Sequence, residues 1–128
     1  LLNLGHTFGH AFEAQAGFNN RLLHGEGVAI GIINAFQLSE RMGLCSGQDT
    51  ERVRRHFNEI GLPTTLTGIA SKNWSPDKII AHMTKDKKWQ QGHQTFVLTK
   101  GIGKAFIHRE VPIETLRVFL SDILRTSN

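Results

Sequence analysis

A ten-residue apolar segment, residues 27–36, constrains the fold of this chain more than any other feature of its sequence. It reads Gly-Val-Ala-Ile-Gly-Ile-Ile-Asn-Ala-Phe and lies within a longer stretch that we expect to be helical from about residue 24 to 42. A helix that is hydrophobic on every side is a buried helix. Its glycines and alanines let neighbouring elements approach closely. The sequence therefore predicts a buried helix, which Gly43 ends as its C′ residue.

The segments before and after this helix are predicted to be helical as well. Residues 1–15 should form a helix that carries apolar and small residues near two histidines. Residues 48–60 should form an amphipathic surface helix, because Val53, Phe57 and Ile60 recur at i, i+4 and i+7. The Gly-Leu-Pro sequence that follows stops this helix, since proline biases the residue before it away from helical angles.

The C-terminal part of the chain predicts two more helices and a hairpin. Ser75-Pro76-Asp77 has the form of an N-cap followed by proline at the first helical position, and that helix should run to about residue 85. Residues 95–99 and 104–109 flank a glycine-containing turn, which indicates a short β-hairpin. A last helix from about residue 112 has one apolar face, made of Ile113, Leu116, Leu120, Ile123 and Leu124. The expected fold class is an all-α, multi-helical domain with a small β-hairpin.

Composition is ordinary for one soluble globular domain. The 128 residues are 39% hydrophobic and 20% charged. No run approaches the roughly 18 apolar residues of a membrane span, and no signal peptide is visible, so we expect no membrane association. The single cysteine, Cys45, excludes an internal disulfide and favours a reducing compartment, so a cytoplasmic location is expected. The chain starts without Met inside a dense motif, and we expect it to be a piece of a longer protein.

The net charge of +4 does not by itself predict a nucleic-acid partner. Basic residues are interspersed with acidic ones at 51–59 and at 85–88, and the chain has no tyrosine. Aromatic–basic interleaving is therefore missing, and we expect no nucleic acid as a partner. A cleft lined by positive charge attracts a phosphorylated small molecule equally well.

Three histidines form the most informative polar pattern. Residues 3–10 read Asn-Leu-Gly-His-Thr-Phe-Gly-His, and residues 23–26 read Leu-His-Gly-Glu. His6 and His10 are spaced i, i+4, so they share one face of a helix with Cβ atoms about 6 Å apart. With His24, they indicate a metal or proton-transfer site. A catalytic zinc ion usually has three protein ligands and an open fourth position.

Each of these polar residues also has an ordinary structural use. Two histidines at i, i+4 are common on helix surfaces, and Asn3 suits a helix N-cap. Glu26 lies in the first turn of its predicted helix, where a carboxylate complements the helix dipole. Lys87 and Lys88 would by composition be solvated. The pattern taken alone does not decide between these uses.

The whole pattern resembles the 3-dehydroquinate synthase family, and the resemblance covers essentially the entire chain. The matching segments occur in the family's order at residues 3–10, 23–26, 28–31, 61–64, 86–88, 96–98 and 102–103. One departure is Gly27, where the family more often has alanine, which affects packing. The resemblance implies that residues 1–128 are the C-terminal metal- and substrate-binding domain. It also implies that an N-terminal, Rossmann-like, NAD-binding domain is absent from this chain.

The resemblance also implies a reaction. The complete enzyme would convert 3-deoxy-D-arabino-heptulosonate 7-phosphate, a phosphorylated sugar acid, to 3-dehydroquinate and phosphate in the shikimate pathway. Bound NAD would carry the transient oxidation and reduction. A divalent metal, zinc or cobalt, would stabilise the alkoxide and polarise the resulting carbonyl. The family is commonly dimeric, so a homodimer is expected.

The resemblance assigns roles to individual residues. His6 and His24 match the family's two metal-binding histidines, and the third ligand, a glutamate, belongs to the absent domain. His10 matches a catalytic histidine that contacts the substrate and supports proton movement. Asn3 matches a substrate-binding asparagine. One of Lys87 and Lys88 matches a substrate-binding lysine, and the sequence does not say which.

Three other functions stay open at the level of sequence. Another sugar-phosphate cyclase, of the 2-deoxy-scyllo-inosose or valiolone type, would share the metal and NAD chemistry. A metal-dependent alcohol dehydrogenase of the glycerol dehydrogenase type would be more remote, and a stand-alone helical binding module belongs to another class. For this chain by itself we expect no activity, negligible NAD binding and weak zinc binding. We also expect the His6 and His24 rings to lie within about 8 Å of each other, since zinc–imidazole bonds are about 2.0–2.1 Å long.

Overall fold

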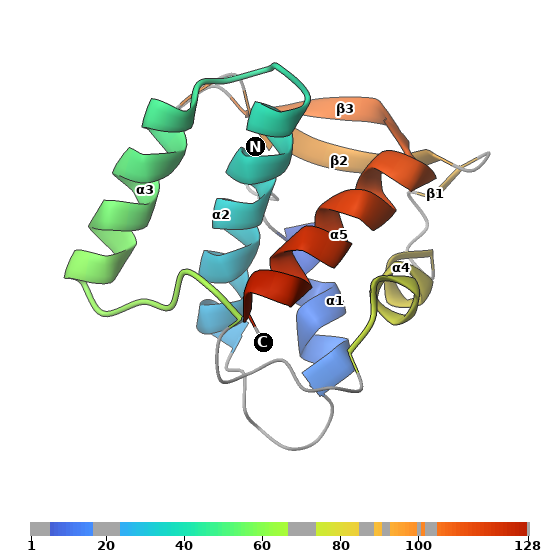
Figure 1. Cartoon of the computed structure of the whole chain (residues 1–128), viewed down its shortest axis with the longest axis horizontal. Coiled ribbons are helices and arrows are strands. Elements are labelled where there is room, and N and C mark those ends of the chain that lie inside the picture. Colours follow the sequence, from blue (N-terminus) through green and yellow to red (C-terminus); the bar gives the residue numbers. More distant parts are fainter. Residues whose placement is uncertain are drawn as a thin grey trace.

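The structure is a computed structural model of the 128-residue chain. It describes the backbone of residues 6–16, 24–66, 74–84, 89–90, 93–99, 101 and 105–127, and side chains at 8–15, 25–66, 74–83, 98–99, 101 and 111–125. Within these ranges the elements (Figure 1) are α1 (His6–Ala16), α2 (His24–Arg41), α3 (Gly47–Glu59), α4 (Pro76–Thr84), β1 (Trp89–Gln90), β2 (His93–Thr99), β3 (Ala105–Pro112) and α5 (Ile113–Ser127). The predicted multi-helical domain with a small hairpin is confirmed.

Helix α2 is buried on nearly all sides, as its apolar sequence predicts. Its buried residues occupy every side of the helix: Gly27, Ala29, Ile30, Gly31, Ile33, Asn34, Ala35, Phe36, Leu38 and Ser39. Helices α1 and α3 and strand β2 all contact it. Because α2 touches both helices that flank it in the sequence and also the distant strand β2, it fixes the positions of these elements relative to one another.

Glycines end two of the helices in the same way. Gly43 follows α2 with a φ of 76°, and Gly61 follows α3 with a φ of 82°. After α2, the N–H of Leu44 donates to the carbonyl of Ser39 at 2.8 Å and the N–H of Gly43 donates to Glu40 at 3.0 Å. The same pair of bonds closes α3, which is the Schellman motif. Both predicted helix ends are therefore confirmed.

The start of α4 is also as predicted. Ser75 is its N-cap, since the N–H of Lys78 donates to the Ser75 Oγ at 3.2 Å. Pro76 occupies the first helical position, where its missing N–H costs nothing.

The predicted hairpin is longer than expected and has a third strand. Strand β2 pairs antiparallel with β3, with a register shift between Gln94 and Phe96, and the two-residue strand β1 pairs with the other edge of β2. The sheet is attached to α2 through a buried hydrogen bond, because the N–H of Thr99 donates to the Ser39 Oγ at 3.0 Å. A strand of two residues leaves too little pattern to be found in a sequence.

Aromatic rings connect α1 to the rest of the core. The Phe8 ring lies 5.7 Å from that of Phe119 on α5, and the Phe12 ring stacks on Trp74 at 6.2 Å. Phe8, Phe12 and Phe119 are all at most 1% exposed. The core is closed on one side by the predicted apolar face of α5, where Leu116, Leu120 and Leu124 are buried. One side of helix α1 is thus held by large buried side chains.

One predicted apolar contact is wrong. Ile60 was expected to share the buried face of the helix before it, yet its side chain is 57% exposed. The helix ends at Glu59 and Ile60 is its C-cap residue, so Ile60 lies beyond the last residue of the face that carries the half-buried Val53 and Phe57. None of the helices in the described ranges is long and apolar enough to cross a membrane.

Candidate metal and substrate site

Helices α1 and α2 touch each other through the backbone of two glycines. A Cβ placed on Gly9 would lie 2.8 Å from the carbonyl oxygen of Gly27 and 3.1 Å from its carbonyl carbon. No side chain fits there, so the close crossing of these helices requires glycine at position 9. Gly25 lies in the same turn of α2, but a Cβ there would meet nothing within 4 Å, so the contact with α1 is made by Gly27.

The crossing brings the first turns of both helices together. His6 is the first residue of α1 and His24 is the first residue of α2. Each precedes its contact glycine, Gly9 or Gly27, by three residues, about 4.5 Å of helix rise. The turns that begin with His6 and His24, the two predicted metal ligands, are therefore in contact through Gly9 and Gly27. The side chains of the two histidines lie outside the described residues, so the predicted ring separation stays a prediction.

His10 follows the contact glycine directly. Its side chain is exposed, although its neighbours Phe8, Ala11 and Phe12 are buried. An imidazole in this position is accessible to a small molecule, as contact with a substrate requires.

The other predicted substrate-binding residues, Asn3, Lys87 and Lys88, lie outside the described residues. Helix α4 ends at Thr84, three residues before Lys87, and packs against α1. The His82 Nε2 atom lies 3.1 Å from the Gln15 Oε1 atom, which joins the C-terminal halves of these two helices. His82 is half-buried as well as hydrogen-bonded.

Glu13 belongs to this region and was missed in the sequence. Its half-buried side chain lies over Gly27, with Oε1 3.0 Å and Cγ 3.2 Å from the position of a Gly27 Cβ. The sequence holds a signal for it, because His6, His10 and Glu13 follow the i, i+4, i+7 spacing of one helix face. The sequence analysis considered only the histidines of this face and therefore did not include this carboxylate.

The donor set fits part of a zinc site. Neutral imidazole is a preferred zinc ligand, and two of them at the start of adjacent helices can share an ion. Among the side chains that the structure describes, no group of three His, Cys, Asp or Glu residues is placed to hold a metal.

Comparison with known proteins identifies the family. Residues 1–89 match the family described as 3-dehydroquinate synthase C-terminal. The chain belongs to this family.

Curated members of the 3-dehydroquinate synthase family are similar over nearly the whole chain. The 3-dehydroquinate synthase of Caulobacter vibrioides is 50% identical over 120 residues, which are 94% of this chain and 32% of the relative. That of Ruegeria pomeroyi is 50% identical over 124 residues, or 97% of this chain and 34% of the relative. The chain therefore spans about a third of the length of the curated relatives it matches.

Solved structures of sugar-phosphate cyclases have the same fold. The 2-epi-5-epi-valiolone synthase from Streptomyces hygroscopicus, solved with NAD+ and Zn²⁺ bound, aligns with a TM-score of 0.75 and 26% identity over 98% of this chain and 33% of that chain. A 2-deoxy-scyllo-inosose synthase complexed with carbaglucose-6-phosphate, NAD+ and Co²⁺ aligns with a TM-score of 0.76 over 95% of this chain and 33% of that chain. At 23% identity the second likeness concerns the fold alone.

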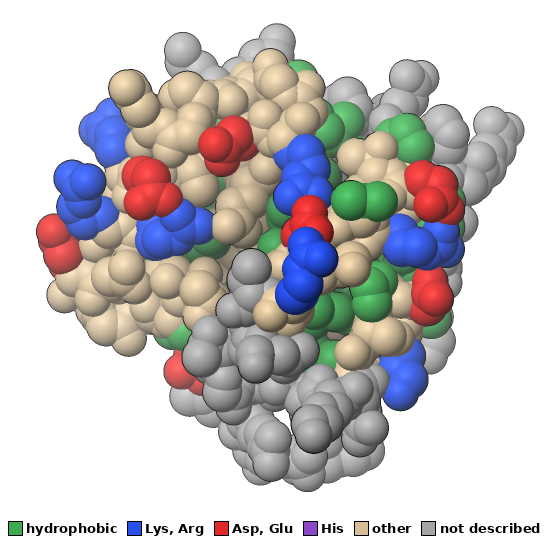
Figure 2. Space-filling model, in the orientation of Figure 1, with side chains coloured by type: hydrophobic (Ala, Val, Ile, Leu, Met, Phe, Trp, Pro, Cys, Tyr) green, Lys and Arg blue, Asp and Glu red, His purple; other side chains and the backbone are tan. Residues whose placement is uncertain are grey.

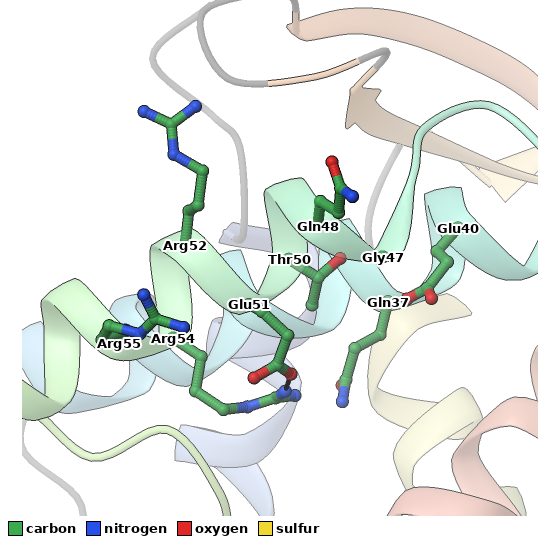
Figure 3. A pocket seen from close by; sticks show the side chains of 9 residues that line it. All are labelled: Gln37, Glu40, Gly47, Gln48, Thr50, Glu51, Arg52, Arg54 and Arg55. Atoms are coloured by element: carbon green, nitrogen blue, oxygen red, sulfur yellow. Dashed lines mark hydrogen bonds and ion pairs between the residues drawn. The ribbon is translucent and has the colours of Figure 1, made fainter.

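A surface groove of about 660 Å³ lies between α2 and α3, away from the contact of Gly9 with Gly27. Gln37 and Glu40 form one wall of this groove, ten or more residues and so about 15 Å along α2 from Gly27. Figure 3 shows Glu51 and Arg54 of α3 paired in it, while Arg52 extends away. Because both acidic and basic side chains line the groove, its electrostatic potential is not strongly positive or strongly negative.

The described surface repeats this mixture of charges. On the face shown in Figure 2, acidic and basic side chains alternate over α3 and α5. Asp122 accepts from Arg41 at 2.8 Å and from Arg125 at 2.6 Å, and Arg117 donates to Asp77 at 3.0 Å. These charges are largely neutralised by one another.

Cys45 is not suited to nucleophilic chemistry. Partial burial raises the pKa of its thiol, and the nearby carboxylates of Asp49 and Glu40 raise the pKa further. The reactive form of cysteine is the thiolate, so a raised pKa keeps this residue inert near neutral pH.

Proposed function

We propose that this chain is the metal- and substrate-binding part of a 3-dehydroquinate synthase. The proposed reaction converts 3-deoxy-D-arabino-heptulosonate 7-phosphate to 3-dehydroquinate and phosphate, a step of the shikimate pathway. The observation that carries this proposal is the 50% identity to the curated enzyme of Caulobacter vibrioides over 94% of the chain.

We propose His6 and His24 as the ligands that this chain gives to a divalent metal ion, zinc or cobalt. The contact of Gly9 with Gly27, one turn after each histidine, supports this assignment. The Zn²⁺ in the related valiolone synthase supports the choice of metal. When bound, the metal supplies Lewis-acid stabilisation of a substrate alkoxide and carbonyl.

The remaining proposed roles belong to side chains around that ion. His10, exposed beside the glycine contact, would contact the substrate and carry a proton. Asn3 and one of Lys87 and Lys88 would orient and neutralise a phosphorylated, anionic substrate. The joining of α4 to α1 through His82 and Gln15 supports this grouping, since α4 ends just before the two lysines.

NAD binding and the third metal ligand are assigned to the part of the relatives that this chain does not match. The chain spans about a third of their length, and it has no glycine-rich strand–turn–helix fingerprint for a dinucleotide. We therefore propose a complete enzyme with a separate NAD-binding domain, acting as a homodimer in the cytoplasm. The isolated chain is expected to be inactive, to bind zinc weakly and to bind NAD negligibly.

The proposal is tested with a chimera in which this chain replaces the matching 120 residues of the Caulobacter vibrioides relative. With NAD and zinc present, the chimera should release phosphate from the heptulosonate substrate. His6→Ala should abolish tight zinc binding, and His10→Ala should lower kcat by about 10²–10⁴-fold at unchanged zinc affinity. His56→Ala, on the exposed face of α3, is the matched control and should behave like the parent.

Two results would contradict the proposal. One is a folded chimera that binds zinc and NAD but releases no phosphate. The other is a His6→Ala variant that binds zinc as tightly as the parent, since that places the metal elsewhere. Phosphate release from a glucose 6-phosphate substrate in place of the heptulosonate would favour the 2-deoxy-scyllo-inosose alternative.

A further inference from the structure

We propose that Glu13 is a positioning residue of the metal site. Its carboxylate, held over Gly27, fixes the first turn of α2 against the histidine-bearing face of α1 and raises the affinity for the metal. The inference rests on the proposed function, because it takes His6 and His24 as the ligands.

Glu13 lies on the histidine face of α1. With 3.6 residues per turn, successive residues are about 100° apart, so His6, His10 and Glu13 fall within an arc of about 60°. Gly9, which touches α2, lies beside this arc. The face of α1 that approaches α2 therefore carries two imidazoles and one carboxylate.

The missing side chain of Gly27 makes room for this carboxylate. The Glu13 Oε1 and Cγ atoms lie 3.0 Å and 3.2 Å from where a Cβ of residue 27 would stand. Gly27 is three residues after His24, at the end of the first turn of α2. The Glu13 side chain thus packs on the same turn that presents the second proposed ligand.

A half-buried negative charge in this position has two favourable consequences. It faces the N-terminal turn of α2, where the helix dipole stabilises an anion. It also adds negative charge beside a site whose two proposed ligands from this chain are neutral imidazoles. Carboxylates that support histidine ligands typically change metal affinity by about 10–100-fold.

A purely structural role for Glu13 predicts something different. If only its methylenes mattered, by filling the space over Gly27, then glutamine would replace it without loss, because the two side chains have nearly the same shape. The charge is therefore the property to remove.

The experiment measures zinc affinity of the same chimera by competition with a chelator. Glu13→Gln should weaken zinc binding by about 10–100-fold and shift the visible absorption spectrum of the Co²⁺-loaded protein. The metal-free protein should unfold only slightly below the temperature of the parent, because the interaction of the Glu13 charge with the helix dipole is weak. Glu59→Gln, which removes an exposed carboxylate at the end of α3, is the control and should change neither quantity.

The outcomes separate this inference from the proposed function. Zinc affinity equal to that of the parent in Glu13→Gln, with His6→Ala still abolishing binding, overturns the role of Glu13 alone. A loss of zinc affinity matched by an equal loss of metal-free stability also overturns it, since that is a folding effect. If His6→Ala keeps tight zinc binding, the proposed function itself fails.

Discussion

The two ends of helix α2 are packed by opposite means. At its start, the helix meets α1 through the backbone of Gly9 and Gly27, and the Glu13 side chain lies across this contact. Near its end, side chains make the connections. Ser39 bonds Thr99 of the sheet, and the Arg41 guanidinium lies 5.2 Å from the centre of the Phe119 ring on α5.

The backbone contact at the start of α2 therefore tolerates less change than the several side-chain contacts near its end. Two backbones in contact cannot adjust to an added atom without moving a helix, and interiors resist such overpacking. Near the end of α2, several side-chain contacts each contribute part of the stability, and the loss of one leaves the others in place. The end of α2 that carries the proposed ligand His24 is therefore the end where the packing geometry is most tightly fixed.

The largest effect is expected from Gly9→Ala. The added methyl group would lie 2.8 Å from the Gly27 carbonyl oxygen, so α1 and α2 must move apart. We expect a loss of about 1–3 kcal/mol in the free energy of unfolding, measured by urea denaturation, together with weaker zinc binding.

Gly25→Ala is the matched control for this substitution. It lies in the same turn of α2 as Gly27, but a Cβ there meets nothing within 4 Å. Because alanine is the better helix former by about 1 kcal/mol, this variant should be as stable as the parent or more stable. Equal destabilisation by both alanines would show that the crossing is not a backbone contact.

Ser39→Ala tests the other end of α2. Its Oγ donates to the Ala35 carbonyl at 2.6 Å and accepts from the Thr99 N–H, and both Ser39 and Thr99 are buried. Removal leaves a buried N–H without its partner, so we expect a loss of about 1–3 kcal/mol, toward the lower part of that range.

Ser46→Ala provides the reference for Ser39→Ala. Ser46 is the N-cap of α3, but its side chain makes no capping hydrogen bond. The variant should unfold at nearly the same urea concentration as the parent. A similar loss at both serines would mean that the bond to Thr99 does not stabilise the sheet.

Arg41→Met should have a smaller effect. It keeps an apolar stem but removes the ion pair with Asp122 and the contact with the Phe119 ring. Both interactions are partly exposed, so we expect about 0.5–1 kcal/mol, decreasing as salt is added. Arg125→Met removes the more exposed partner of Asp122 and should cost less; the reverse order would contradict the role given to Arg41.

Gly27→Ala should change stability by no more than a few tenths of a kcal/mol, because the gain in helix propensity offsets a tight contact. The new Cβ meets the flexible end of Glu13 and lies 3.4 Å from the Gly9 oxygen. Gly9→Ala and Gly27→Ala should thus differ in their cost to stability, because the first meets backbone and the second meets a side chain that can move. A loss as large as that of Gly9→Ala would show that Glu13 cannot move.

The smallest effect concerns Cys45. Burial and two carboxylates raise the pKa of its thiol, so the thiolate forms only at higher pH than in the unfolded chain. Iodoacetamide should alkylate Cys45 more slowly in the folded protein than in urea, at a pH near 8. A raised pKa also means that any stability from the neutral thiol is complete below the unfolded pKa and is lost as pH rises through the folded one. Faster alkylation in the folded state would contradict the direction of the shift.

The sequence predicted the helices well because their signals are local. The burial of α2 follows from a run with no polar face, and Gly43, Gly61 and Ser75 mark helix ends through backbone angles and capping bonds that neighbouring residues decide. Ile60 was misplaced because a periodic count does not show where a helix ends, and Ile60 is the C-cap residue after Glu59.

For the candidate site, the sequence predicted which residue types take part, and the structure showed how the two helices that carry them cross. The i, i+4 histidines and the pattern around His24 can be recognised in the sequence, and they were enough to suggest a metal site. The choice of Gly27 rather than Gly25 as the contact, and the place of Glu13, depend on how two helices cross.

Residue order alone thus determined the helices, the buried position of α2 and the residue types available for chemistry, since these follow from periodicity and backbone preference over a few neighbouring positions. Only the tertiary structure decided that Gly9 meets Gly27, that Glu13 lies over the first turn of α2, and that His82 joins α4 to α1 through Gln15. Each of these contacts depends on the distance and angle between helices, which all the buried side chains set together and no short segment encodes.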